Sequence, residues 1–413
     1  MKKKTSSLPW ISILVALASA VGIYYLPEYH LWFLAVLLLN LLASLVFGKR
    51  YGNGALTICR LLVGALFIFS SFTKGVDPLG TKYKMLDYLS VYGMTWLNGA
   101  AMVLAVLMIL AEFIVGICLI TKVFPRLAVL GATLLMLFFT TTTLFDALYN
   151  LVPDCGCFGS AIKMTNWQTF YKNLVIDAVL IPLIINNKRF ENHFGKGLQF
   201  VIGLAFAAAF LGFEIYNYRH LPVIDFMNWK VGKQLNAEPA TASKAYVIYR
   251  NKATGKTEEY LPSSPDYHWN DSVWMSEREF VGQRLEDGAD YLGFTALNQD
   301  GEDVTDDVLN TENLLMFTSH DLSKVTEKEW EKMRQISEAA TSKDFKVLWT
   351  VSAEPEEVDL LRAKYDFVYD VYFADELEIK TIVRSNPGLI WLDNGLVKDK
   401  WSVFDFSKAL KAF

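Results

Sequence analysis

The chain has 413 residues, 53% of them hydrophobic, and a formal net charge of −5. Residues 1–221 carry 17 Lys and Arg against 9 Asp and Glu, whereas residues 222–413 carry 22 against 35. A hydrophobic first half and an acidic second half exclude one compact soluble domain. They also argue against nucleic acid as a partner, because nucleic-acid binding needs a basic surface.

The first half contains seven apolar segments of a length that can cross a bilayer, which takes roughly 20 residues. The predicted spans are residues 8–26, 30–48, 55–73, 97–121, 125–149, 168–186 and 197–217. The basic start Lys2–Lys4 resembles that of a signal peptide. However, the apolar run after it lacks a small-residue cleavage site, and Pro27 begins a turn into the next span. We therefore expect an uncleaved first helix.

The basic residues of the short loops predict the orientation of the spans. With seven spans, one side holds Lys2, Lys3, Lys4, Lys49, Arg50, Lys122, Arg126, Lys188, Arg189 and Lys196, and the other holds Lys74, Lys82, Lys84 and Lys163. The first side is predicted to be cytoplasmic. The N-terminus then lies in the cytoplasm of a bacterial inner membrane, and residues 222–413 lie in the periplasm.

Two further segments of the chain have recognisable patterns. Residues 82–89 space aromatic and apolar residues near the helical period, which favours a short helix in the outer membrane interface over an ordinary tethering loop. From residue 222 onward, strands and amphipathic helices alternate. A hairpin is predicted at 245–250 and 257–261, and a β-rich linking region at 222–309.

Residues 310–413 show an α/β order with a final strand pair. Strands are predicted at 314–317, 345–351, 367–373, 388–392 and 397–402. Helices are predicted from 326 to about 341 and at 356–365, 377–384 and 405–412. Thr326 and Glu329 have the spacing of a capping box at the start of the first of these helices.

Cys155 and Cys157, separated by Gly156, follow the fifth predicted span on its outer side. A Cys-x-Cys disulfide closes a very small ring, so we expect it to be readily reduced, which favours redox chemistry. The alternative is that the two thiols are inert and lie in a tight turn. A weaker alternative is that they form half of a metal site, since zinc takes four ligands and this turn offers two. Asp154 opposes thiolate formation by like-charge repulsion, and Lys74 or Lys163 would offset it if folding brought either one near.

Several charged residues fall within or beside the predicted spans, where charges are costly and serve a functional or a pairing role. Glu112 and Asp177 are candidates for a polar pocket that takes a quinone or conducts protons, with bonding between helices as the alternative. Asp146 lies toward the CGC turn, and Lys74 follows the third span. Arg60 near the inner end is expected to extend toward the interface.

Cys59 and Cys118 fall near the cytoplasmic ends of their spans. They are roughly 30 Å, the thickness of the hydrocarbon layer, from the outer pair, too far for direct exchange. We interpret them as small buried residues rather than as an inner redox pair.

Residues 55–190 resemble the DoxX superfamily. The segments that carry the resemblance are residues 60–70 followed by Lys74, and residues 112–119 followed by Pro125 and Arg126. The run Cys155-Gly156-Cys157-Phe158-Gly159 is similar to the MauE branch of that superfamily. With two leading helices in 1–54, a seventh in 191–221 and an outer domain, the chain resembles DoxX/MauE-type proteins of Bacteroidetes.

This resemblance implies a four-helix membrane core and redox-related roles. MauE implies thiol or disulfide maturation of a periplasmic amine dehydrogenase, and DoxX relatives imply thiosulfate:quinone oxidoreduction. A similar bundle in vitamin K epoxide reductase relatives implies electron transfer from thiols to quinone. Those relatives use Cys-x-x-Cys, whereas this chain has Cys-x-Cys.

Residues 310–413 resemble a thioredoxin-like fold, with Pro387 where that fold carries a cis-proline before a strand. The dithiol position corresponds to residues 318–323, which include His320 but no cysteine. The resemblance implies that Pro387 and His320 hold a client peptide, or that the domain serves only as a scaffold.

The predicted fold is therefore an α-helical integral membrane bundle with a soluble α/β thioredoxin-like domain. The predicted function is thiol:disulfide exchange by Cys155 and Cys157, with quinone and periplasmic proteins as candidate partners beside the membrane lipid. A non-enzymatic membrane scaffold is the alternative. A transporter is a weaker one, since we see no inverted repeat.

Overall fold

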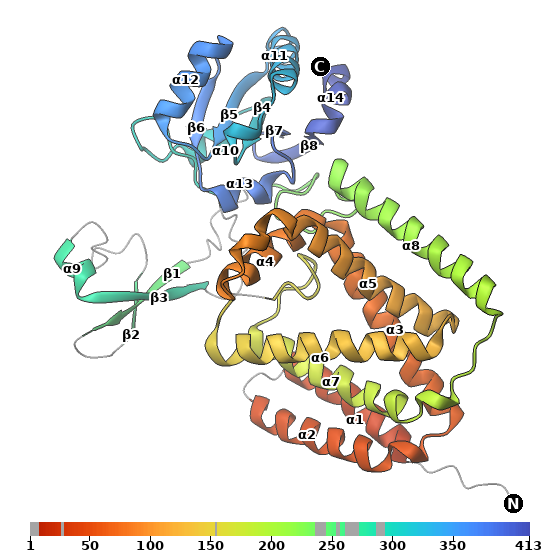
Figure 1. Cartoon of the computed structure of the whole chain (residues 1–413). Helices are drawn as coiled ribbons and strands as arrows, with labels where there is room; N and C mark the ends of the chain where they lie inside the picture. The colour runs from red at the N-terminus through yellow and green to blue at the C-terminus, as the bar shows by residue number, and fades with distance from the viewer. Residues whose placement is uncertain are drawn as a thin grey trace, which may run out of the picture. The chain divides into compact units, whose positions relative to one another are not determined.

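The structure, a computed structural model, describes residues 8–25, 29–152, 155–235, 245–252, 257–260, 272–285 and 294–413. The chain divides into two compact units, Met1–Phe226 and Met227–Phe413. The first unit is helical and the second contains the strands (Figure 1). Lys2–Lys4, Pro27, Asp154 and the turn at 253–256, which the sequence analysis singled out, lie outside the described residues.

The helices of the first unit follow the predicted spans closely. They are α1 (Leu8–Tyr25), α2 (His30–Phe47), α3 (Asn53–Val76), α4 (Pro78–Val91), α5 (Ala101–Thr121), α6 (Pro125–Tyr149), α7 (Asn166–Ile185) and α8 (Lys196–Arg219). Among the described residues, six helices are long and apolar enough to cross a membrane, namely α2, α3, α5, α6, α7 and α8. In α1 the apolar stretch is shorter, Pro9–Gly22. Six membrane-capable helices are thus established, and the seventh span stays a prediction.

Small and polar residues join these helices. A Cβ atom on Gly116 of α5 would lie 2.9 Å from the carbonyl oxygen of Gly64 on α3, so glycine lets these two backbones approach closely. In the α1–α2 pair, the buried Ser12 hydroxyl donates to Asn40 Oδ1 at 2.6 Å, and Asn40 Nδ2 donates to the Ser12 carbonyl at 3.1 Å. Contacts of this kind hold helices together where apolar burial alone gives no preference between lipid and protein.

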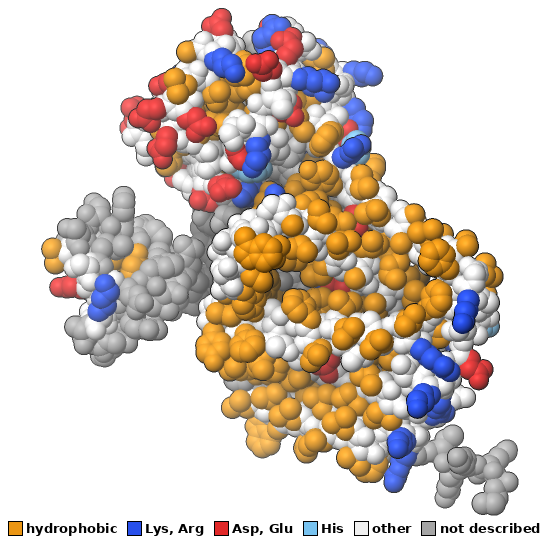
Figure 2. Space-filling view, in the orientation of Figure 1, with side chains coloured by type: hydrophobic (Ala, Val, Ile, Leu, Met, Phe, Trp, Pro, Cys, Tyr) orange, Lys and Arg blue, Asp and Glu red, His pale blue; other side chains and the backbone are white. Residues whose placement is uncertain are grey.

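The outside of the helical unit is apolar. Figure 2 shows hydrophobic side chains covering the face of this unit that is turned to the viewer. Trp32, Leu137 and Phe200 are each more than 60% exposed. In a bilayer such side chains contact lipid, so the surface agrees with a membrane protein.

The sequence predicted a helix within residues 82–89, and α4 confirms it over a longer stretch. Asp77 caps α4 by accepting from the Gly80 amide at 2.8 Å, and Pro78 occupies the first turn, where it costs no hydrogen bond. The location of α4 in the membrane interface stays a prediction.

The second unit contains two sheets. Strands β1 (Ala245–Asn251), β2 (Thr257–Tyr260) and β3 (Arg278–Leu285) form an antiparallel sheet in the order β2-β1-β3. Strands β4 (Leu314–Ser319), β5 (Lys346–Val351), β6 (Asp370–Phe373), β7 (Gly388–Asp393) and β8 (Leu396–Ser402) form the second, in the order β6-β5-β4-β7-β8. The pairs β4–β5 and β5–β6 are parallel, and β4–β7 and β7–β8 are antiparallel.

The helices of this unit are α9 (Ser272–Ser276), α10 (Thr305–Leu309), α11 (Glu327–Thr341), α12 (Pro355–Tyr365), α13 (Glu376–Ile382) and α14 (Phe406–Ala412). The predicted capping box of Thr326 and Glu329 opens α11. Trp330 and Met333 of α11 pack with Phe317 and Trp349 of the sheet in one core. All the helices and strands predicted in 310–413 are present, but β6 begins three residues later than predicted.

Candidate functional site

The CGC segment lies in the loop between α6 and α7. A capping box of Thr165 and Gln168 fixes the start of α7 and so ends this loop. Cys155 and Cys157 are joined by a disulfide, with their Cα atoms 5.5 Å apart. The glycine between them has φ +61°, a conformation that residues with a Cβ rarely adopt.

Gly159 presses this loop against the end of α3. Its φ is +54°, and a Cβ atom there would lie 2.9 Å from the carbonyl oxygen of Thr73. Glycine therefore serves both the backbone conformation and the close approach. The contact brings the disulfide loop beside Lys74, the next residue of α3.

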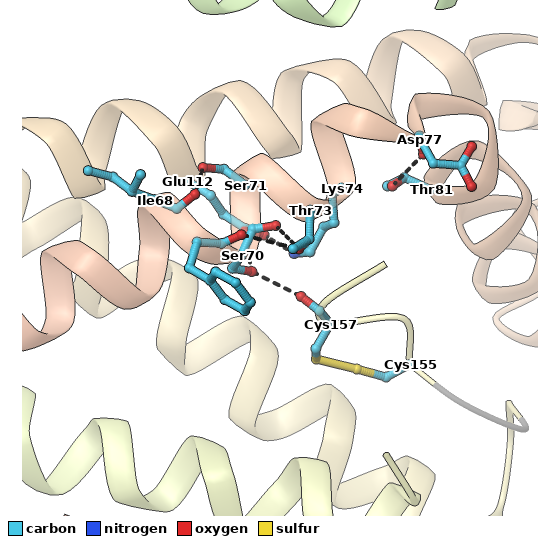
Figure 3. A network of polar contacts seen from close by, with 11 residues as sticks. Ile68, Ser70, Ser71, Thr73, Lys74, Asp77, Thr81, Glu112, Cys155 and Cys157 are labelled. Carbon is cyan, nitrogen blue, oxygen red and sulfur yellow. Dashed lines mark hydrogen bonds and ion pairs between the residues drawn. A yellow bond between two sulfur atoms is a disulfide. The ribbon is translucent and has the colours of Figure 1, made fainter. Parts of the chain in front are cut away.

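A buried ion pair lies beside the disulfide loop (Figure 3). Lys74 Nζ of α3 lies 2.5 Å from Glu112 Oε1 of α5, and their side chains are 5% and 1% exposed. The Ser70 hydroxyl lies 2.8 Å from Glu112 Oε2 and 2.9 Å from the Cys157 carbonyl oxygen. Ser70 thus links the carboxylate to the backbone of the CGC turn. A buried pair satisfied in this way is costly to break, because the remaining charge would be uncompensated.

The disulfide and the ion pair line one cavity of about 180 Å³. Its apolar wall includes Phe67, Met108, Met136 and Phe139, and α4 contributes Met85 and Tyr88. Its polar lining includes Ser70, Lys74, Glu112, Lys172 and Asn173. A mostly apolar cavity with a few convergent polar groups is the usual form of a small-molecule site.

Lys172 of α7 also faces this cavity. Its Nζ lies 4.6 Å from the ring centre of Phe158, the residue after Cys157. Phe158 in turn packs edge-on against Phe69 of α3, with ring centres 5.3 Å apart. Lys172 and Phe158 also line a second hollow, with Ala161, Met164 and Gln168.

One comparison with known proteins found a match. Residues 52–185 match the family model of methylamine utilisation protein MauE. The match runs from the residue before α3 to the end of α7, so it contains both cysteines and the charged residues of the cavity. No curated protein matches the chain. No solved structure matches it either.

Within the MauE-matching region, the predicted pocket residues do not all come together. Glu112 and Lys74 line the cavity, as do both cysteines, whereas Asp177, Asp146 and Arg60 do not. Asp177 accepts from Thr140 Oγ1 at 2.8 Å, which satisfies it between α6 and α7. In this structure Asp177 thus makes a bond between helices, the alternative given for it, and a role in proton conduction stays a prediction.

Asp146 and Arg60 also have structural partners. Asp146 accepts a hydrogen bond from the Tyr88 hydroxyl at 2.6 Å. Tyr88 lines the cavity and Asp146 does not, so Asp146 contacts the cavity wall from outside. Arg60 is 4% exposed and donates to the carbonyl oxygens of Leu119 and Ile120. These carbonyls belong to the last turn of α5, where a cation is favourable. Arg60 is thus buried at a helix end rather than extended toward the interface.

The sequence analysis missed several residues of the cavity, above all Lys172. The signal that singled out Asp177, a charge within a predicted span, applies equally to Lys172 in the same span. Glu214 of α8 carries the same signal: it is 1% exposed, and neither carboxylate oxygen has a hydrogen-bond partner among the described residues. Cys59 and Cys118 are free and buried, as expected of small core residues.

In the second unit, the structure brings His320 and Pro387 to neighbouring loops. The Asn386–Pro387 peptide bond is cis. Asn386 Oδ1 accepts from the His320 and Asp321 amides at 2.9 and 3.2 Å, and Asn386 Nδ2 donates to the Asp321 carbonyl at 2.7 Å. Burial, followed by the charge of Lys380, lowers the pKa of His320 to about 4. This histidine is therefore neutral at physiological pH.

The described residues do not contain a cluster of three or more His, Cys, Asp or Glu that could hold a metal ion.

Proposed function

We propose that this chain is a membrane thiol:disulfide redox protein of a bacterial inner membrane, with Cys155 and Cys157 as its working pair. One observation carries the proposal: the disulfide lines the same cavity as the buried Lys74–Glu112 pair. The match to a methylamine utilisation family supports a role in a membrane-associated maturation or redox process.

The reaction is a two-electron exchange. A thiolate of a partner attacks one sulfur, the bond between Cys155 and Cys157 breaks, and its electron pair leaves on the other sulfur. A second thiol of the partner then displaces the mixed disulfide. The partner leaves as a disulfide, and the protein holds two thiols, having gained two electrons and two protons. The reverse sequence oxidises a partner.

A quinone is the candidate small-molecule partner. Apolar walls and a polar end are suited to a flat ring that carries oxygen acceptors, and about 180 Å³ admits a ring of that kind. Ser70, Lys172 and Asn173 are the lining side chains that can donate hydrogen bonds to such oxygens.

For the second unit, we propose a thioredoxin-like domain on the periplasmic side that holds a protein client. The order β6-β5-β4-β7-β8, with α11 after β4 and cis-Pro387 before β7, supports this fold. His320 and Pro387 lie on adjoining loops, where a client would bind.

The test is to trap thiols with acid in membranes held at a series of redox potentials. The peptide that carries Cys155 and Cys157 is then read by mass after alkylation. A reversible two-electron transition above about −300 mV, the upper range of structural disulfides, would support the proposal. A pair that stays in one state throughout would refute it.

A non-enzymatic scaffold remains the second candidate, because all four cysteines lie in residues 1–221 and residues 222–413 contain none. The second unit therefore cannot perform dithiol chemistry itself. Full function in cells of a Cys155→Ser/Cys157→Ser variant would favour the scaffold.

A further inference from the structure

The charges that line the cavity do not balance. Among the described residues, its lining contains Lys74, Lys84 and Lys172 but, as the only carboxylate, Glu112. Lys74 is paired with Glu112 at 2.5 Å, and Lys84 Nζ lies 3.9 Å from Asp87. Among the described residues, Lys172 contacts an aromatic ring and makes no ion pair, and Glu112 acts on it only at longer range. Among the described residues, Lys172 is therefore the lysine of this lining that makes no ion pair.

A charge in an apolar helical bundle carries a large desolvation cost, and a nearby anion lowers this cost and favours the charged form. The ring of Phe158 compensates only part of this cost, since a cation–π contact is worth about 0.5–2 kcal/mol. An anion on sulfur beside Lys172 would lower the remaining cost.

Opening the disulfide supplies such an anion. In each step of exchange, one sulfur attacks as a thiolate and another leaves as a thiolate. The disulfide lines the same cavity as Lys172, and Phe158, under the ammonium group, directly follows Cys157.

We propose that Lys172 stabilises the negative charge that develops on sulfur when the Cys155–Cys157 disulfide is opened by a partner thiolate. This proposal rests on the proposed redox function and deepens it by assigning an electrostatic role to a residue of the same cavity. Lys172 stabilises the negative charge on sulfur and takes no part in bond making. Its partner is the cysteine thiolate, and the Lys74–Glu112 pair is already neutralised within itself.

Other charged and titratable groups around the cavity must be considered. On α4 these are Lys84, Tyr88 and Tyr92, and on α6 Asp146, which is bonded to Tyr88. On α7, Asp177 is bonded to Thr140, and in the loop Lys163 is exposed. Asp154, next to Cys155, opposes thiolate formation and lies outside the described residues. Lys172 is the unpaired cation of this set that adjoins the residue after Cys157.

The experiment measures thiolate formation directly. The full chain, in detergent, is reduced and freed of reductant, and the alkylation rate of Cys155 and Cys157 by iodoacetamide is followed from pH 5 to 10 by mass spectrometry. We expect Lys172→Met and Lys172→Gln to raise the apparent thiol pKa by about one unit. At neutral pH this means an alkylation rate about tenfold lower.

Two variants serve as controls. Lys172→Arg keeps the charge and should restore the wild-type profile. Lys163→Met removes an exposed lysine of the neighbouring loop and should leave the profile unchanged. Thermal unfolding of each variant shows whether it is folded, and two different neutral substitutions guard against one that fails to fold.

The reduction potential gives a second readout that a merely structural lysine would not move. Loss of thiolate stabilisation disfavours the reduced form where the thiolate is populated, so at a pH above the thiol pKa a tenfold change in the exchange equilibrium lowers the potential by about 30 mV. Identical pH profiles for wild type and both neutral variants would overturn the proposal. Alkylation of the reduced protein measures the thiol pKa and does not require a redox partner. The proposed redox function is tested by a different measurement, the redox titration of the wild-type pair. A pair that stays in one state in that titration refutes the function, whatever the alkylation profiles show.

Discussion

At the scale of single residues, Lys74 and Glu112 form a buried ion pair in the helical unit. Both side chains are nearly inaccessible, and Ser70 occupies the second carboxylate oxygen. A buried ion pair can be exchanged for apolar residues with little loss, but removing one partner leaves an unpaired charge. A structural role therefore predicts that removing one partner destabilises the protein and that replacing both restores its stability.

We therefore predict that Lys74→Met lowers the free energy of unfolding by about 3–5 kcal/mol, because Glu112 remains charged and buried. The double variant Lys74→Met/Glu112→Leu should recover most of that loss. Thermal unfolding in detergent measures both. A double variant that is as unstable as the sum of the two single variants would show that the pair is not coupled.

His320 gives a pH dependence in the second unit. Its pKa of about 4 lies below the ordinary value of 6.5, so folding favours the neutral form. Its contribution is complete above about pH 6.5 and is lost as the pH falls toward 4, at most about 3 kcal/mol.

The measurement for His320 follows urea unfolding of the full chain by oxidation of Met316 and Met333, both 0% exposed. Wild type should lose stability between pH 6.5 and 4. His320→Gln, which cannot be protonated there, should show a flatter profile. Parallel profiles of the two proteins would contradict this assignment.

At the scale of elements, the seating of the disulfide loop on α3 depends on Gly159. A methyl group there meets the Thr73 carbonyl at 2.9 Å, and the backbone has φ +54°. The steric clash and the backbone strain both affect the loop, and neither affects the core of the helices. We thus predict that Gly159→Ala displaces the CGC turn from Lys74 while the bundle stays folded.

Alkylation of the reduced pair should report this displacement as a changed pH profile, with the melting temperature lowered by only a few degrees. Gly195→Ala is the matched control, because its Cβ would meet open space. A Gly159→Ala protein with wild-type thiol reactivity would show that the loop position does not matter to the cysteines.

The elements themselves could largely be predicted from the sequence, because apolar runs and capping residues are local signals. The strands at 314–317 and 345–351 and the capping box at Thr326 illustrate this. The cavity could not be predicted in the same way. Lys74 and Glu112 are 38 residues apart, and only packing of α3 against α5 brings them together. Lys172 had a local signal, but its relation to Cys157 depends on the fold of the loop.

At the scale of the whole molecule, the structure gathers the basic loops at one end of the helical unit. Arg189 donates to the Tyr51 carbonyl and to Asn53 Oδ1, and Arg126 donates to the carbonyls of Lys188 and Phe190. The loops at 48–53, 122–126 and 186–195 are therefore neighbours. Clustered basic loops favour the cytoplasmic side.

The side of the membrane predicted for the second unit then does not depend on α1. Three membrane-capable helices, α3, α5 and α6, separate Lys49 from Lys163, so we predict that these residues lie on opposite sides. Two more, α7 and α8, are predicted to return the chain to the side of Lys163 before the second unit begins. Whether α1 crosses the membrane decides only the side of residues 1–7.

Cysteine labelling in intact cells tests this topology in a Cys155→Ser/Cys157→Ser background. We predict that a maleimide unable to cross the inner membrane labels Lys163→Cys and Lys411→Cys at once, and Lys49→Cys only after permeabilisation. All three lysines are exposed, so protection reflects the membrane rather than burial. Labelling of Lys411→Cys that requires permeabilisation would place the second unit in the cytoplasm. The disulfide loop and its proposed client-binding domain would then lie on opposite sides of the membrane, and a shared client would be impossible.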